Sequence, residues 1–171
     1  MNPELSLSTA CLRSGKWARW PAIVTVALLA LSLPAAADFA GGLQAYDAGD
    51  YARALEEWRT AAGKGDIDAM VGLAGLHASG FGVRQNYASA AQWYEKAARR
   101  GHASAQLNLG DAYARGRGVK RDLIAGHMWL SLAAGQGKIW AAQRRDQLEK
   151  SMTPTQIASA QARASAFRLV K

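Results

Sequence analysis

The stretch Asp68-Ala-Met-Val-Gly-Leu-Ala74 returns 36 residues later as Ser104-Ala-Gln-Leu-Asn-Leu-Gly110. The same offset holds through the residues that follow each stretch. It pairs Leu73 with Leu109, His77 with Tyr113, Gly80 with Gly116, Gly82 with Gly118, Val83 with Val119, Trp93 with Trp129, and Gly101 with Gly137. A fixed period of roughly 20 to 50 residues is the signature of repeated supersecondary units. The sequence therefore predicts a stack of similar units.

Each unit is expected to hold two helices. Alanine is the strongest helix former and supplies much of the hydrophobic 50% of the chain, whereas aromatic residues make up only 8%. Small and apolar residues recur at helical spacing, and Gly80 and Gly116 are placed to end the first helix of each unit. The helices are predicted, in order, at residues 69–78, 87–99, 105–115 and 123–134. Because one hairpin cannot bury its own apolar face, neighbouring hairpins must stack, which predicts an all-α solenoid.

A shortened unit precedes these two. Tyr46 and Gly49 repeat the spacing of Tyr113 and Gly116, and Trp58 then precedes an Ala-Ala pair and a glycine, as in the later units. The turn at Gly49 is several residues shorter than the later connectors. The array over residues 38–137 is therefore predicted to hold about three hairpins, at residues 38–66, 67–102 and 103–138.

The repeated pattern is specific enough to point to a family. Ala-x-x-x-Leu-(Gly/Ala)-x-x-(Tyr/His)-x-x-Gly-x-Gly-Val, followed by Trp-(Tyr/Leu)-x-x-Ala-Ala-x-x-Gly, resembles the Sel1-like repeat over residues 40–137. Three positions depart from the family pattern: His77 replaces a tyrosine, Gly126 replaces an alanine, and Leu130 replaces a second aromatic residue. The family is similar to tetratricopeptide proteins. The resemblance implies an α-solenoid that acts as an adaptor and binds another protein in a curved groove.

Residues 1–37 have the order of a secretory signal peptide. Three basic residues precede an uncharged stretch of 13 residues, 21–33, which is followed by Pro34 and three alanines. A membrane-spanning helix needs about 20 apolar residues, so the short stretch favours a cleaved leader over an uncleaved anchor. Cleavage is predicted after Ala37, and the protein is predicted to be periplasmic or secreted by a bacterium.

Removal of the leader would change the composition of the chain. It would remove Cys11, the only cysteine, so the mature chain could form no disulfide. The formal net charge would fall from +8 to +6, with 18 Lys and Arg against 12 Asp and Glu over residues 38–171. Basic chains often bind nucleic acid, but export argues against such a partner. We expect no stable membrane span after cleavage, and a monomer or weak oligomer.

The pattern changes after the last repeat, and residues 138–171 are predicted to cap the open end of the array. Residues 140–148 and Met152 fit one amphipathic helix. Thr153-Pro154-Thr155-Gln156 then offers a threonine N-cap, a proline at the first helical position and a glutamine at the third, which is typical of a capping box. A closing helix is expected at residues 157–168.

No catalytic constellation is recognisable in the sequence. It contains no His-Glu-x-x-His zinc motif, no Gly-x-Ser-x-Gly elbow, no phosphate-binding glycine loop with lysine and no Ser-x-x-Lys. His77, His102 and His127 are spread over separate parts of the repeats and form no local ligand pair. We therefore expect no enzymatic activity, no metal and no cofactor. A hydrolase is a third alternative that no motif supports.

Two further features leave alternatives open. Trp58, Trp93 and Trp129 recur near one register of the second helices, and this periodicity favours a packing role over a sugar-binding platform. Basic pairs at the turns, among them Arg99-Arg100 and Arg144-Arg145, can contact an acidic protein, anionic lipid or peptidoglycan carboxylates, or simply be solvated. A cell-envelope module that binds peptidoglycan or its processing enzymes is therefore the second alternative.

The concave surface of the solenoid is the candidate partner-binding site. Outward positions of the first helices supply it, and they vary between units where the core positions do not, although a merely solvated face would vary in the same way. The candidate residues are Asp68, Val71, Ser79, Ser104, Leu107, Asp111 and Arg115. The leading interpretation is an exported, non-catalytic adaptor that binds a protein or peptide partner in the cell envelope.

Overall fold

Eight α-helices follow one another along residues 38–169, the part of the chain that the computed structural model describes. They are α1 (Phe39–Asp47), α2 (Tyr51–Gly63), α3 (Ile67–Ser79), α4 (Tyr87–Arg99), α5 (Ala103–Arg115), α6 (Leu123–Gly135), α7 (Ile139–Glu149) and α8 (Pro154–Ala166). No strand occurs in this part of the chain, so the all-α prediction is confirmed. The expected signal peptide at residues 1–37 lies outside the described residues.

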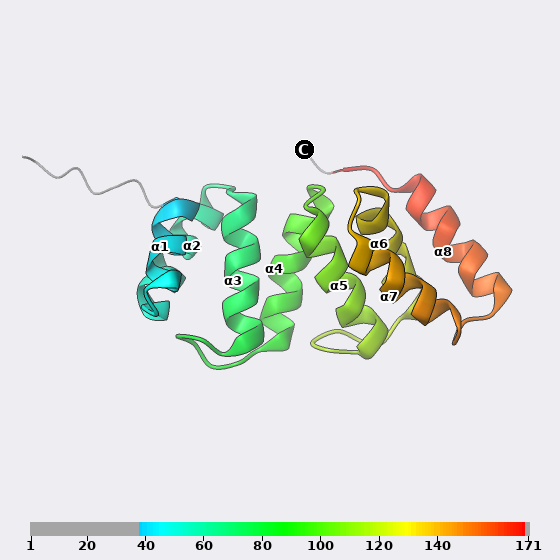
Figure 1. Cartoon of the computed structure of the whole chain (residues 1–171), viewed down its shortest axis with the longest axis horizontal. Helices are drawn as coiled ribbons and strands as arrows, with labels where there is room; N and C mark the ends of the chain where they lie inside the picture. Colours follow the sequence, from blue (N-terminus) through cyan, green and yellow to red (C-terminus); the bar gives the residue numbers. More distant parts are fainter. Residues whose placement is uncertain (1–37, 170–171) are drawn as a thin grey trace, which may run out of the picture. The chain divides into compact units, whose positions relative to one another are not determined.

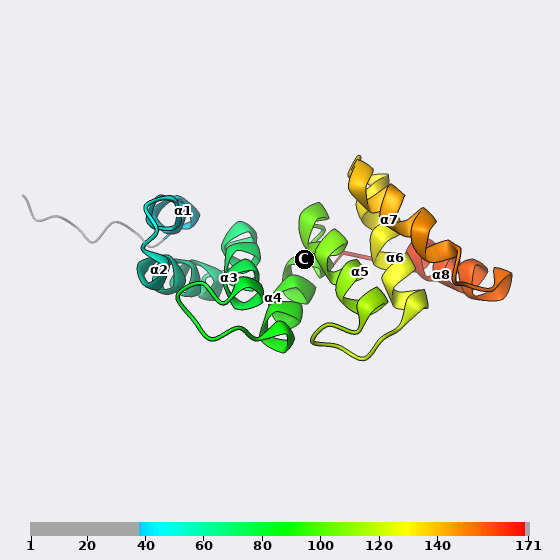
Figure 2. The same ribbon diagram turned by 60° about the horizontal axis from the view of Figure 1, so that its bottom comes forward.

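The helices of residues 38–169 pack as successive hairpins within one compact unit. The first three pairs, α1 with α2, α3 with α4 and α5 with α6, form hairpins, and contacts of α2 with α3, α4 with α5 and α6 with α7 join neighbours. Figure 1 shows the helices following one another in chain order. In Figure 2 the first helix α1 lies above the second helix α2, and α7 lies above α8. Each hairpin thus buries its apolar face against the next one, as the repeat pattern predicts.

Short polar side chains and glycines set the ends of the helices. Asp50, Asp66, Asn86 and Asp122 are N-caps, and each side chain accepts a hydrogen bond from a backbone N–H in the first turn. The first helices α3 and α5 both end in a left-handed glycine, Gly80 with φ of 80° and Gly116 with φ of 70°. The helix ends expected at these glycines are confirmed.

The core follows the 36-residue register. Ala69, Leu73 and their repeat equivalents Ala105 and Leu109 are at most 1% exposed. Trp58 and Trp129 are buried at 3% and 4% exposure, which confirms their packing role. Trp93 differs, because it is only half-buried and the Lys96 ammonium covers its ring at 3.9 Å. The middle tryptophan therefore contributes less to the core than the repeat predicts.

The C-terminal helices depart from the prediction in two respects. The predicted amphipathic helix ends at Glu149, so Met152 lies in the turn that follows, and Trp140 at its start is 73% exposed. The buried residue of α7 is the small Ala141, which packs with Leu130 and Ala133 of α6. The capping box expected at Thr153 is present at the start of α8.

The last helix folds back over the array. α8 packs against α6, and Phe167, just after α8, meets the ring of Trp129 edge-on with 5.1 Å between ring centroids. Leu169 then lies against Gly101, in the turn between α4 and α5. Within residues 38–169, none of the helices is both long and apolar enough to cross a membrane.

Candidate functional site

The predicted partner-binding residues lie on two neighbouring first helices. α3 carries Asp68, Val71 and Ser79, and α5 carries Ser104, Leu107, Asp111 and Arg115. We call these seven residues the first-helix face. They are exposed or half-buried, in contrast to the fully buried alanines and leucines of the same helices.

The structure brings Asp111 and Arg115 into one charged cluster with a residue of α7. The Asp111 carboxylate lies 4.0 Å from the Arg115 guanidinium and 3.9 Å from that of Arg144. Asp111 and Arg115 separate two hollows, since they line both a pocket of about 150 Å³ between α4 and α5 and one of about 320 Å³ between α5 and α7. Asp111 and Arg115 are thus the predicted site residues that the fold brings together with a further charged side chain.

Asp68 is committed to a different contact. Its Oδ1 atom lies 3.1 Å from Nε2 of His102, the N-cap residue of α5. Nδ1 of the same imidazole accepts a hydrogen bond from the Ala105 backbone N–H at 3.2 Å, so the N–H of the neutral ring is on Nε2 and donates to Asp68. Asp68 therefore helps to orient the cap between two hairpins, a role that the sequence did not reveal.

The remaining predicted residues are less available to a partner. Val71 and Leu107 are half-buried and pack against the apolar clusters of the array, so they differ from the outward positions expected for them. The Ser79 hydroxyl donates to the Gly75 carbonyl at 2.9 Å in the last turn of α3. Ser104 is half-buried at the start of α5.

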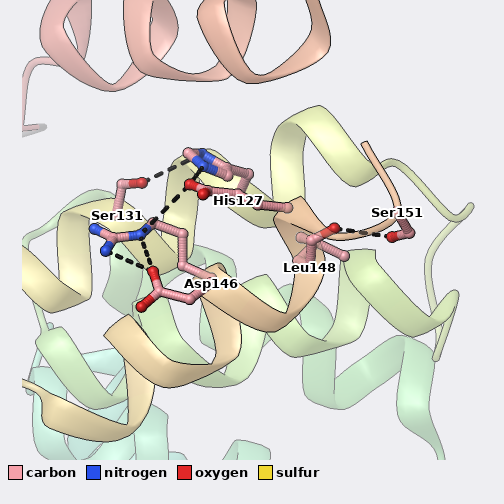
Figure 3. A network of polar contacts seen from close by, with 7 residues as sticks. His127, Ser131, Asp146, Leu148 and Ser151 are labelled. Carbon is pink, nitrogen blue, oxygen red and sulfur yellow. Dashed lines mark hydrogen bonds and ion pairs between the residues drawn. The ribbon is translucent and has the colours of Figure 1, made fainter. Parts of the chain in front are cut away.

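Sequence reasoning missed a network between α6 and α7 that Figure 3 shows around His127 and Ser131. The His127 side chain is 1% exposed, and its Nε2 atom lies 2.7 Å from Oε1 of Glu149. Its Nδ1 atom lies 3.3 Å from the Ser131 hydroxyl, four residues along the same helix. Arg145 flanks Glu149 at 3.8 Å and pairs with Asp146 at 2.7 Å. A histidine at helical spacing from a serine was the only signal in the sequence.

The order of serine, histidine and carboxylate in this network is also the order found in serine hydrolases. Acyl transfer further requires preorganised N–H donors around the developing oxyanion. Ser131 lies in the middle of α6, where the backbone N–H groups donate along the helix. The geometry shown by the network is that of a polar tie between α6 and α7.

His77, at the aromatic position of its repeat, is a packing residue with an unusual environment. Its Nδ1 atom is buried and has no hydrogen-bond partner among the described residues. Burial, and secondarily the charge of Arg59, lowers the pKa of the imidazole below its ordinary value. Within the described residues, no three His, Cys, Asp or Glu side chains come together as a metal site would require.

Several of the basic residues at the turns have structural partners. Arg100 donates to the Gly65 carbonyl at 2.9 Å, and Arg121 donates to the Ala114 carbonyl at 3.1 Å. Arg99 pairs with Glu95 one turn earlier on α4 at 2.7 Å. These contacts favour helix-end and surface roles for these basic residues.

The fold defines a class: a stack of helical hairpins with a 36-residue period, which is an α-solenoid. The Sel1 repeat model matches residues 67–102 and 103–138. Residues 67–138 are therefore similar to two successive Sel1 repeats, in agreement with the resemblance seen in the sequence.

Solved structures agree with this assignment. The protective antigen c5321 of uropathogenic Escherichia coli, which displays an SLR fold, is 28% identical with a TM-score of 0.71 over 74% of this chain and 28% of its own. A Sel1 repeat protein from Oxalobacter formigenes is 27% identical with a TM-score of 0.63 over 77% of this chain and 56% of its own. The chain thus spans well under two thirds of either relative. No curated protein matches the chain.

Proposed function

We propose that this protein is an exported, non-catalytic adaptor that binds a protein or extended peptide along the first-helix face. One observation carries the proposal: the core positions of α3 and α5 repeat while the outward positions change. Ala69 and Ala105 are both 0% exposed, whereas the preceding residues are an exposed aspartate, Asp68, and a half-buried serine, Ser104. Sel1-repeat arrays typically serve as protein-interaction scaffolds, and a surface that varies on a constant core suits that role.

Export to the periplasm or beyond rests on the order of residues 1–37. The test is fractionation of cells that produce the full chain with a C-terminal tag, followed by mass measurement of the tagged product. A product in the envelope fraction that begins at Asp38 supports export. An uncut product in the cytoplasm contradicts it.

The first-helix face is tested by site-specific photo-crosslinking in living cells. A benzophenone amino acid is placed at Asp68 or Arg115 of the full chain, and at Gln92 or Ala158 on the second helices as matched controls; all four positions are exposed. Covalent products from the first pair and none from the controls would support the proposal and identify the partner. Products from the controls alone would contradict it.

The cell-envelope alternative is supported by exposed basic side chains in the connector before α6. Arg117 and Lys120 are exposed there, within reach of carboxylates on a polymer. The test is sedimentation of the full chain with purified peptidoglycan. Binding that the double variant R117Q/K120Q abolishes, and that a benzophenone amino acid at Asp68 or Arg115 leaves intact, would favour this alternative.

A further inference from the structure

The register of the first helices continues onto α7, beyond the recognisable repeats. Ala69, Ala105 and Ala141 follow one another at 36-residue intervals, and each is 0% exposed. Trp140 directly precedes Ala141, just as Asp68 precedes Ala69. Trp140 therefore occupies on α7 the outward position that the candidate face occupies on the earlier first helices.

Trp140 and its neighbour Ile139 are exposed to an unusual degree. They are 73% and 72% exposed, whereas Trp58 and Trp129 are 3% and 4% exposed. Adjacent large apolar side chains in solvent are a mark of interaction surfaces, and tryptophan is among the residues that most often anchor a partner. Nothing in the packing of α7 requires this tryptophan, because Ala141 supplies the buried contact.

Basic side chains line the surface next to Trp140. Arg144 is one helical turn further along the same face of α7. It lines the pocket of about 320 Å³ together with Arg115 and Lys150, over a floor that includes Leu130 and Leu148. We call Arg115, Arg117, Trp140, Arg144 and Lys150 the α5–α7 surface.

The cations of this surface outnumber its anions. Asp111 is the only acidic residue lining either of the two pockets that carry these four basic residues. At 4.0 and 3.9 Å from Arg115 and Arg144, it neutralises part of their charge but lies beyond hydrogen-bond distance. The guanidinium donors therefore stay free to bind a carboxylate in the forked geometry that arginine favours.

Charge is also distributed unevenly along the array, with the basic excess on the C-terminal side, where the α5–α7 surface lies. Residues 38–83 carry 3 Lys and Arg against 7 Asp and Glu, whereas residues 84–171 carry 15 against 5. The half of the chain that contains α5 and α7 is thus strongly basic, and the first hairpin and α3 are acidic. An acidic ligand would be attracted to one end of the array and repelled from the other.

We infer that the α5–α7 surface binds an acidic peptide segment whose carboxylates contact Arg115 and Arg144 and whose large apolar side chain packs on Trp140. A peptide fits the surface better than a polysaccharide or a lipid headgroup layer. The reason is that an exposed tryptophan and an apolar-floored pocket lie beside the cations, and only a peptide offers acidic and apolar side chains in alternation. This inference rests on the proposed adaptor function and specifies the chemistry of its partner.

The test uses the full chain and fluorescence anisotropy at about 0.15 M salt, where exposed charges are screened beyond about 8 Å. The probe is a fluorescein-labelled twelve-residue peptide of glutamates with two leucines and one phenylalanine, and its glutamine-for-glutamate version is the control. We expect the acidic probe to bind at least tenfold more tightly than the glutamine probe, with a blue shift of tryptophan emission that is lost in W140A.

Variants of the protein locate the binding. R115E with R144E should weaken binding at least tenfold, and the neutral pair R115Q with R144Q should show a smaller loss in the same direction. R99E with R163E makes the same charge change on the second helices and should weaken binding less than twofold. D111N should tighten binding several-fold, because it removes the one anion from the surface.

Equal binding of the two probes, or equal losses for the two double reversals, would overturn the inference. So would tighter binding to phosphatidylglycerol vesicles or polygalacturonate than to the acidic peptide. If crosslinks at Arg115 capture a partner that the acidic probe does not displace, the adaptor function stands and only the acidic chemistry is wrong. If no crosslinks form on the first-helix face but the probe binds, the adaptor function is what fails.

Discussion

The imidazole of His77 occupies the position that Tyr113 occupies in the next hairpin, with its Nδ1 atom buried and unpaired among the described residues. Its pKa is lowered by burial and by the charge of Arg59, so the unfolded chain binds a proton more readily than the native protein. We expect stability to fall as the pH is lowered through the ordinary value of 6.5, and to level off below the lowered native pKa.

H77Y should remove this acid sensitivity, because tyrosine carries no charge between pH 5 and 8 and restores the residue of the neighbouring repeat. Urea midpoints at several pH values in that range, for wild type and H77Y, provide the measurement. The slope between pH 7.5 and 5.5 should be shallower for H77Y. An unchanged slope would mean that His77 does not cause the acid sensitivity.

The N-cap residues of α3, α5 and α7 allow a second prediction at the scale of single residues. Asp66, His102 and Lys138 hold equivalent N-cap positions, and only the lysine makes no side-chain cap hydrogen bond. H102A should lower the free energy of unfolding by about 1 kcal/mol, the usual cost of a lost N-cap, whereas H102N should retain most of it. K138D should raise it by a similar amount, since it adds an acceptor and a favourable charge at the helix N-terminus. Urea denaturation of the three variants measures these changes in the free energy of unfolding. Equal effects of H102A and H102N would contradict the capping role of His102.

At the scale of elements, the connectors between the two helices of a hairpin pack on the preceding hairpin. A Cβ on Gly118 would lie 2.1 Å from the Tyr87 carbonyl oxygen at the start of α4, and φ there is 72°. Gly137 has a φ of 84° but open space around it. G137A should therefore cost about 1–2 kcal/mol, the penalty of the left-handed conformation alone.

G118A should cost well over that amount, because the connector or α4 must also move to relieve the clash. The measurement is the difference in unfolding free energy between the two variants, which share the sign of φ and the added methyl group. Similar costs for both variants would mean that the connector shifts freely and contributes little to the stacking of hairpins.

The repeat register explains which elements were predictable. Helices α3 to α6 begin and end within a few residues of their predicted bounds, because glycines and capping side chains recur at one offset. The exposure of Trp140 was not predictable from amphipathicity, which assigns the largest apolar residue to the core. Ala141 is the residue of α7 that packs with Leu130 and Ala133 of α6, and which side of α7 faces α6 is a property of the tertiary structure.

The candidate site was predictable only in part for a similar reason. Asp111 and Arg115 were placed correctly on α5, but their pairing with Arg144 depends on how α7 packs beyond the last repeat. The network of His127 with Glu149 likewise joins residues 22 positions apart that no periodicity relates. Contacts that occur once, outside the repeat, leave no pattern in a single sequence.

At the scale of the whole molecule, stability should be distributed as in other solenoids, with each hairpin supported mainly by its neighbours. α8 covers α6 through Ala160, which is 0% exposed, and the chain after it covers Trp129 through Phe167. A chain that stops after Met152 should therefore lose hydrogen-exchange protection first in α6 and α7, while α2 to α4 stay protected.

F167A in the full chain is the matched control, because it keeps α8 and removes only the ring that meets Trp129. It should produce a smaller loss of protection in the same helices. Uniform loss along all the helices in the truncated chain would instead mean that the array unfolds as a single cooperative unit. In that case the C-terminal helices would stabilise the α5–α7 surface and the distant first hairpin equally. An acidic ligand bound at that surface would then raise hydrogen-exchange protection throughout the array rather than only near its site.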